Sequence, residues 1–307
     1  MTIGIATRGP GAGAAAMQIL RAVEAIGSGA IGGFAVFHWR DAAGALHHAV
    51  TQDQGSLTLN PAPGWETATH AAIISSGPNR PEPLLQFLPG HADIGFVTGH
   101  RLPSSLLPDG SVLNTTALQA MSAGGFDQAA LKTLLAGGPA LDAGLICLPL
   151  SGPVLIADSP RVRSRDDTGR FHWSAGPDLA CALLHNSIHA ASVHGQALAE
   201  ALGGIGREAL GGPAAGHVCT RLPDRLPVHA AAADFIEISP AGEVIALHSA
   251  DPAYHGARGR ITAIYQSTPV HCQGRGIGQA VSEVFSGLEP GLLIQGPRRD
   301  FVWKRDS

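Results

Sequence analysis

The sequence is poor in lysine, in aromatic residues and in charge. Its 307 residues include only two lysines, Lys132 and Lys304, and charged residues make up 14% of the chain, against about a quarter in an ordinary globular domain. With so few lysines, lysine-rich targeting signals are excluded and Schiff-base chemistry has few candidates. The net charge of −4 and the scattered arginines argue against a nucleic-acid partner. So little surface charge predicts a homo-oligomer.

Cysteine pairs and long apolar runs are also missing. The four cysteines are far apart and form no CxxC motif, which is typical of reduced, buried thiols in a cytoplasmic protein. No basic segment precedes an apolar run at the N-terminus, and no apolar run reaches the roughly 18 residues of a membrane span. We therefore expect a cytoplasmic protein that has no membrane contact and acts on a small molecule.

The pattern of apolar residues predicts strands and helices in mixed order. Two hairpins, at 31–51 and 235–247, indicate antiparallel pairing. Further strands are expected at 2–7, 71–75, 94–98, 144–148, 154–157, 218–221 and 261–265. Helices are expected at 14–26, 114–121, 127–136, 177–202 and 277–285.

Hairpins and helices mixed in this way predict an α+β fold with a largely antiparallel sheet and helices outside it. We expect one domain over residues 1–307. The polar, charged segment 161–174 is the one place where the chain could divide, because its composition is that of a surface loop.

Thr2 is the first candidate for catalysis. A threonine that becomes N-terminal carries both a hydroxyl nucleophile and, in its own α-amine, a base. Removal of Met1 alone would expose it, and the residues that follow, Ile3-Gly4-Ile5-Ala6, have the pattern of a buried strand. No lysine occurs in the first hundred residues, and Arg8 is the nearest cation along the chain.

This start, the two hairpins and the segment 125–146 resemble the N-terminal-nucleophile hydrolases, the broad class that includes proteasome subunits and isoaspartyl peptidases. The resemblance implies a layered αββα-like sandwich with largely antiparallel sheets. It also implies hydrolysis of a small amide or peptide-like C–N bond with no cofactor and no metal. We expect Thr2 to attack and its freed amine to take the proton; an inactive relative would have the same sequence features.

Two loops that follow expected strands are candidates for substrate binding. The first is Thr98-Gly99-His100-Arg101, in which His100 can exchange a proton near neutral pH and Arg101 can hold a carboxylate. The second is Ser75-Ser76-Gly77-Pro78-Asn79-Arg80, where Ser75, Ser76 and Asn79 supply hydrogen-bonding groups. Alternatively, both segments are ordinary loops that are exposed to solvent at the ends of strands and have no role in binding.

The turn Gly9–Ala14 supports a different function, that of an NAD(P)-dependent oxidoreductase. It matches G-x-G-x-x-A, follows a strand and opens a helix, as in dinucleotide-binding proteins. The acidic residue expected about twenty positions later is missing, since that region reads Gly32-Gly33-Phe34. The alternative interpretation is a tight turn without a ligand, because glycine-rich segments arise easily in a chain that has 40 glycines.

A third alternative is a metal-binding or non-catalytic ligand-binding protein. His185 and His189 are four residues apart in the helix expected at 177–202, so both imidazoles would lie on one face and could share a metal ion. No glutamate follows His185, as it would in the zinc-binding motif H-E-x-x-H. The alternative interpretation is that the two histidines have only a structural role.

Overall fold

The computed structural model describes residues 1–27, 31–77 and 79–306. The chain divides into two units, one of residues 1–20 with 27–214 and one of residues 21–26 with 215–307. Segment 161–174, where a break seemed possible, lies inside the first unit. There it contributes to helix α4 (Pro160–Arg163) and strand β9 (Thr168–Ala175).

Strand β1 (Thr2–Arg8) lies in the middle of the first unit's larger sheet. Its seven residues are all buried, so both faces of the strand are covered. The six strands have the order β3-β2-β4-β1-β10-β9, and every neighbouring pair is antiparallel. The other four strands are β2 (Ala35–Arg40), β3 (Leu46–Thr51), β4 (His70–Ser76) and β10 (Leu179–Asn186).

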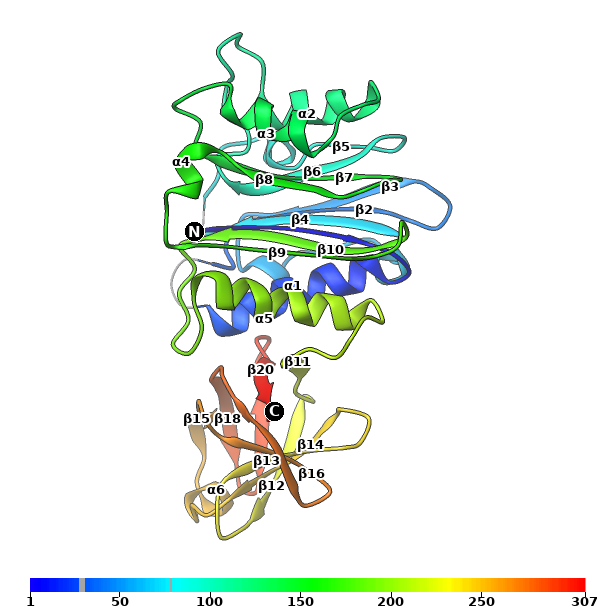
Figure 1. Cartoon of the computed structure of the whole chain (residues 1–307). Helices are drawn as coiled ribbons and strands as arrows, with labels where there is room; N and C mark the ends of the chain where they lie inside the picture. The colour runs from blue at the N-terminus through cyan, green and yellow to red at the C-terminus, as the bar shows by residue number, and fades with distance from the viewer. Residues whose placement is uncertain (28–30, 78, 307) are drawn as a thin grey trace. The chain divides into compact units, whose positions relative to one another are not determined.

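Helices and a second sheet cover the two faces of this sheet (Figure 1). Helices α1 (Ala12–Ile26) and α5 (Gly195–Ala209) lie on one face. The second sheet lies on the other, in the order β5-β6-β7-β8. Helices α2 (Leu113–Ser122) and α3 (Gln128–Ala136) cover its outer side. The strands are β5 (Gly90–His91), β6 (Gly95–Arg101), β7 (Ala143–Pro149) and β8 (Leu155–Asp158).

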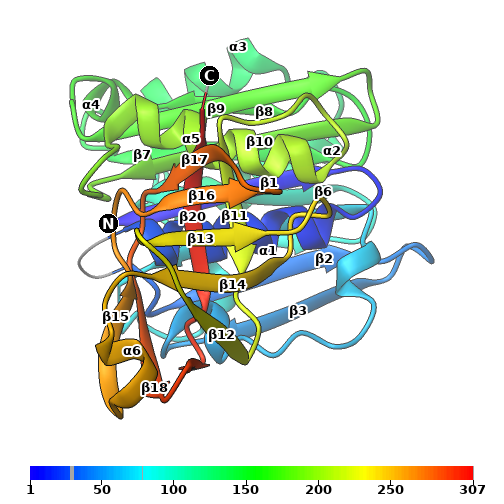
Figure 2. The same cartoon turned by 90° about the horizontal axis from the view of Figure 1, so that it is seen from below.

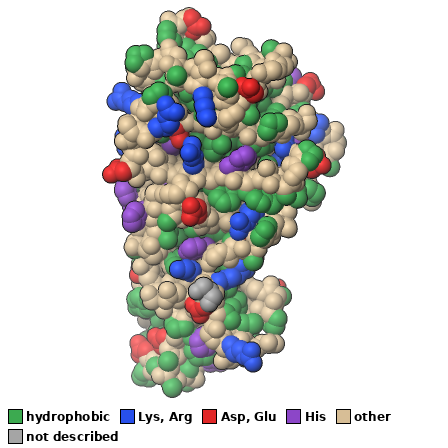
Figure 3. Space-filling model, in the orientation of Figure 1, with side chains coloured by type: hydrophobic (Ala, Val, Ile, Leu, Met, Phe, Trp, Pro, Cys, Tyr) green, Lys and Arg blue, Asp and Glu red, His purple; other side chains and the backbone are tan. Residues whose placement is uncertain are grey.

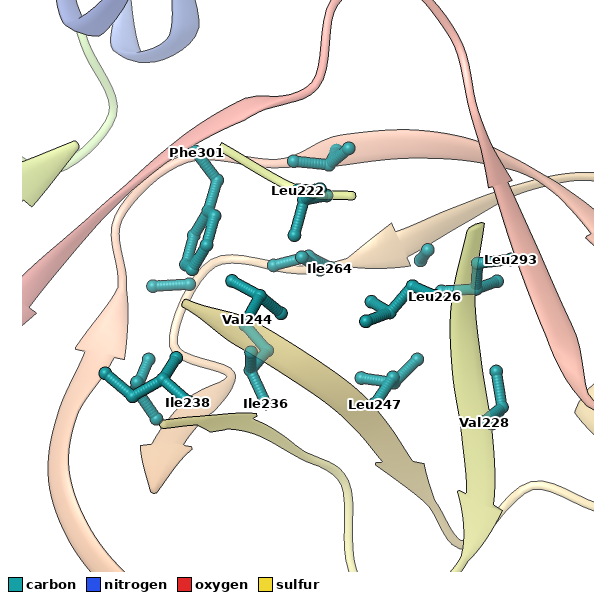
Figure 4. Packing of buried hydrophobic residues seen from close by; sticks show 14 of the residues in the cluster. Leu222, Leu226, Val228, Ile236, Ile238, Val244, Leu247, Ile264, Leu293 and Phe301 are labelled. Carbon is teal, nitrogen blue, oxygen red and sulfur yellow. The ribbon is translucent and has the colours of Figure 1, made fainter. Parts of the chain in front are cut away.

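The second unit consists mainly of one sheet of ten strands, in the order β11-β20-β17-β16-β13-β14-β12-β19-β18-β15. Figure 2 shows β16, β13 and β14 side by side, and the pairs β12–β14 and β13–β16 are parallel. Leu226, Leu247 and Leu293 lie close together in its buried core (Figure 4). The elements are β11 (His217–Arg221), β12 (Arg225–Ala230), β13 (Phe235–Ile238), β14 (Val244–Ser249), α6 (Ala253–Gly256), β15 (Gly259–Ile264), β16 (Pro269–Cys272), β17 (Arg275–Ala280), β18 (Val284–Glu289), β19 (Leu292–Gln295) and β20 (Asp300–Arg305).

The predicted fold class, an αββα-like sandwich for the whole chain, is wrong. The protein is mostly β, with 39% strand and 22% helix, and its ten-stranded sheet is a curled half-barrel. The reason lies after residue 215, where short strands follow one another through turns. The only helix described in that part, α6, has four residues.

Several elements are confirmed, and two predicted helices are wrong. The hairpins occur as β2–β3 and β13–β14, and Asp127 caps α3 by accepting hydrogen bonds from two backbone amides. The helix expected at 177–202 is instead strand β10, a loop and α5. The helix expected at 277–285 lies in strands β17 and β18. Within the described residues, no helix is long and apolar enough to cross a membrane.

Candidate functional site

Three neighbouring strands of the six-stranded sheet meet at the position of Thr2. Strand β1 begins there, and its antiparallel neighbours β4 and β10 both end there. Thr2 is paired with Ser76 on one side and with Asn186 on the other. All three residues are buried, so they form a polar row at the edge of an otherwise apolar layer.

The side chains of this row point toward the four-stranded sheet. Alternate residues of a strand share one face, and Ala6, Ile74 and Leu184 belong to the apolar cluster between the two sheets. Thr2, Ser76 and Asn186 lie an even number of residues from these three. The polar row therefore continues the layer between the sheets.

Strand β6 brings His100 to the same level. Thr98 donates a hydrogen bond to the carbonyl of Ile73 at 2.8 Å, and Ile73 is paired with Ile5 of β1. One residue further along β6, Gly99 lies against Gly4. His100 follows, so it lies level with the beginning of β1, where the polar row is.

His100 is completely buried and is held by an acidic residue. Its Nε2 lies 2.8 Å from Oδ1 of Asp158, whose side chain is 9% exposed. A carboxylate accepts, so Nε2 carries the proton and Nδ1 has the lone pair. Nδ1 is buried and has no hydrogen-bond partner among the described residues. The imidazole is thus oriented, with one nitrogen available to accept a proton.

Asn186 is held by a second chain of polar contacts. Its Nδ2 donates to Oγ of Ser187 at 3.0 Å, and Ser187 donates to Oδ2 of Asp167 at 2.5 Å. Asp167 is held in turn by both Nε and Nη2 of Arg165. Hydrogen bonds from Arg165 lower the pKa of the Asp167 carboxyl well below its usual range. Oδ1 of Asn186 is buried and has no partner in the described part of the chain.

The amine at the start of the chain lies in a positive field. Burial lowers the pKa of the Met1 amine, and Arg80 and Arg101 lower it further. Arg8, the cation nearest in sequence, lies at the other end of β1, where it donates to the carbonyl of Pro149. The two cations with the largest effect on the amine therefore follow β4 and end β6, and smaller effects come from Asp167, which raises the pKa of the amine, and Arg165, which lowers it.

The predicted substrate-binding residues differ in what they already contact. Ser75 and Thr98 both donate to backbone carbonyls. Arg101 forms a two-pronged pair with Asp142, and that pairing lowers the pKa of the Asp142 carboxyl. The two guanidinium nitrogens of Arg101 that a substrate carboxylate would need are therefore occupied by Asp142. The role of Arg101 in substrate binding stays a prediction.

Backbone geometry marks the same region. Asn79, Arg101 and Ser187 have φ values of 55°, 65° and 53°, in the left-handed region that residues other than glycine seldom adopt. Each follows or ends one of the strands β4, β6 and β10. Asn79 is exposed, and Pro78 beside it lies outside the described residues.

The backbone of residues 65–68 packs against the glycine-rich turn. It lies at the far end of β1 from Thr2, and a Cβ on Gly13 would be 1.8 Å from the carbonyl oxygen of Trp65. The amide of Ala12, at the start of α1, donates to the carbonyl of Ala68. The backbone around residues 65–68 thus covers the helix end where a pyrophosphate would bind.

The histidine pair is not a metal site of the predicted kind. His185 lies in strand β10 and His189 in the loop after it, so they do not share a helix face. Nε2 of His185 donates to the carbonyl of Gly195 at 2.9 Å, which joins β10 to the start of α5. No group of three or more metal-ligating side chains occurs among residues 1–27, 31–77 and 79–306.

Sequence reasoning missed several residues of this site. Asp158, Asn186 and Asp167 were not predicted. Strand pairing brings Asn186 to Thr2, and hydrogen bonds join Asp158 to His100 and Asp167 to Ser187. Arg80 lies in a loop that was identified, yet was not named as a binding residue. An available signal was that expected strands 71–75 and 94–98 both end in a Ser or Thr followed closely by an arginine.

The chain belongs to the family described as a domain of unknown function, DUF6963, whose model matches residues 2–218. A second domain of unknown function, DUF7259, matches residues 225–300. No curated protein and no solved structure matches the chain. All of the site residues described above lie within the first match, and the second match lies within the ten-stranded unit.

Proposed function

We propose that this protein hydrolyses a small amide or peptide-like C–N bond, and that Thr2 is the nucleophile after Met1 is removed. The observation that carries the proposal is the position of Thr2. It begins the central strand, and Ser76 and Asn186 flank it on the same buried face.

The chemistry needs only groups of this chain. Oγ1 of Thr2 attacks the amide carbon and passes its proton to the freed α-amine, which gives a tetrahedral oxyanion. The oxyanion collapses, the C–N bond breaks, and the leaving amine takes the proton. Water then attacks the threonyl ester and releases the acid, so that Thr2 is regenerated.

The surroundings favour the neutral form of the amine. Burial and nearby arginines lower the pKa of the Met1 amine, and a Thr2 amine one residue further along would lie in the same field. A neutral amine can accept the hydroxyl proton, whereas a charged one cannot. This arrangement replaces the lysine that the first hundred residues lack.

His100 would assist in the proton transfers. Asp158 fixes its Nε2 proton, which leaves the unpaired Nδ1 to take a proton from water or return one to the leaving amine. Asn186 Nδ2 donates one proton to Ser187, and its second proton would be the donor beside Thr2 for the developing oxyanion.

The experiment is designed around the free amine. The full chain is made with an N-terminal fusion that a protease removes directly before Thr2, and an amide library is assayed before and after cleavage. We expect activity only after cleavage, loss in Thr2→Ala and retention in Thr2→Ser. Thr133→Ala, an exposed change on α3, is the matched control. Equal activity in Thr2→Ala would overturn the mechanism.

A further inference from the structure

The arginines near the start of β1 differ in whether an acid neutralises them. Arg101 is paired with Asp142, and Arg165 is paired with Asp167, each through two nitrogens. Those four charges cancel within the fold. Arg80 forms no ion pair with any carboxylate among the described residues.

Arg80 is nevertheless held firmly in place. Its backbone amide donates to Oε1 of Gln52 at 2.8 Å, and its carbonyl accepts from Nε2 of the same glutamine at 2.6 Å. Its side-chain Nε donates to Oγ of Ser76 at 2.9 Å. Gln52 therefore fixes the main chain, and Ser76 fixes the guanidinium.

The contact with Ser76 places the guanidinium beside the reactive residue. Ser76 is the residue paired with Thr2 across the sheet. The positive charge of Arg80 is the first among the charges that lower the pKa of the Met1 amine. With Nε held by Ser76, the two Nη groups form no hydrogen bond within the described residues, so their protons are available to a ligand.

We propose that the substrate carries a carboxylate close to the scissile amide, and that Arg80 binds this carboxylate through its two Nη groups. The inference rests on the proposed function, since it names the substrate class of the same site. A held but unneutralised guanidinium suits this task, because its planar fork matches the two oxygens of a carboxylate. Arg101 and Arg165 each already bind an aspartate through two guanidinium nitrogens.

The surface arginines of α4 are a different group. Figure 3 shows several Lys and Arg side chains gathered on the face that carries α4, and Arg161 and Arg163 lie in the last turn of that helix. Arg163 is exposed. It therefore provides a control for electrostatic attraction that does not depend on Arg80.

The test measures binding, so it does not depend on turnover. The protein used is the Thr2→Ala variant of the whole chain from residue 2 onward. It is titrated by calorimetry with acetate, succinate and glutarate, and with the uncharged diamides of succinate and glutarate. We expect at least one carboxylate to bind at least tenfold more tightly than its diamide. Arg80→Gln should weaken that binding at least tenfold, whereas Arg163→Gln should leave it unchanged.

A second variant guards against loss of folding. Arg80→Lys keeps the charge and loses the fork, and should bind more weakly than the parent and more tightly than Arg80→Gln. The proposal is overturned if no carboxylate binds, if the diamides bind equally well, or if Arg80→Gln binds like the parent. Arg80-dependent binding without hydrolysis by the Thr2 protein would instead refute the proposed function and leave the carboxylate site standing.

Discussion

Gly4 of β1 and Gly99 of β6 lie in direct backbone contact between the two sheets of the first unit. A Cβ on Gly4 would be 2.5 Å from the carbonyl oxygen of Gly99, closer than a carbon and an oxygen can approach. This contact fixes the position of His100 relative to Thr2, because His100 follows Gly99 directly and Thr2 lies two residues before Gly4. The site therefore depends on two residues that have no side chains.

Replacing Gly4 by alanine should destabilise the protein. The added methyl group meets backbone, which cannot rotate away, and overpacking of this kind costs about 1–3 kcal/mol. Urea unfolding followed by circular dichroism measures the change. Gly216→Ala is the control, since Gly216 is exposed and a Cβ there meets nothing within 4 Å. Equal stability of the two variants would show that the sheets can separate at little cost.

The His100–Asp158 pair should contribute to stability as well as to the site. Removing the acceptor leaves the buried Nε2 proton of His100 without a partner and costs about 1–3 kcal/mol. We expect Asp158→Ala to lose stability in this range. Asp93→Ala breaks a pair with His91 at the surface, where the side chain of His91 is 54% exposed and that of Asp93 is 90% exposed. This change should cost less than about 1 kcal/mol. Similar losses in both variants would contradict the buried role.

Stability should fall as the pH decreases from about 6.5 to about 4. Burial lowers the pKa of His185 from 6.5 to about 4, and that of His38 to about 4 as well. Both side chains are then neutral in the folded state at pH 5, whereas the unfolded chain binds protons there. The contribution to stability is present above pH 6.5 and is lost as the pH falls toward 4, by about 2 kcal/mol per histidine between pH 7 and pH 5.

Urea unfolding at pH 7 and pH 5 measures this effect. His185→Gln keeps a donor for the carbonyl of Gly195 and removes the titrating group, so the difference between the two pH values should shrink. His91→Gln, at an exposed position, is the control and should leave the difference unchanged. An undiminished difference in His185→Gln would mean that His185 already binds a proton in the folded state.

The sequence was sufficient for elements with a strong local signal. Strand β3 (Leu46–Thr51) and the cap at Asp127 follow from alternation and from a carboxylate that accepts backbone hydrogen bonds. Strand β10 was mistaken for a helix because residues 180–186 are all buried. A strand covered on both faces has no alternation, and its apolar run cannot be distinguished from that of a helix.

The site was predictable only in part, for a different reason. Thr2, His100 and Ser76 were named from their own neighbours in sequence. Asn186 is 184 positions from Thr2, and its place beside Thr2 depends on the register of an antiparallel pair. One residue of slippage would turn it to the opposite face, and no local pattern fixes that register.

The same electrostatics predict how Arg80 acts on the N-terminal amine. Removing a nearby positive charge stabilises the protonated amine, so Arg80→Gln should raise the pKa of the Thr2 amine. Burial is the larger cause of the lowered pKa and stays in place. Acetylation of the amine at a series of pH values, read by mass spectrometry, measures this without a substrate. Arg163→Gln should leave the value unchanged, and an unchanged value in Arg80→Gln would place its guanidinium too far from the amine to assist catalysis.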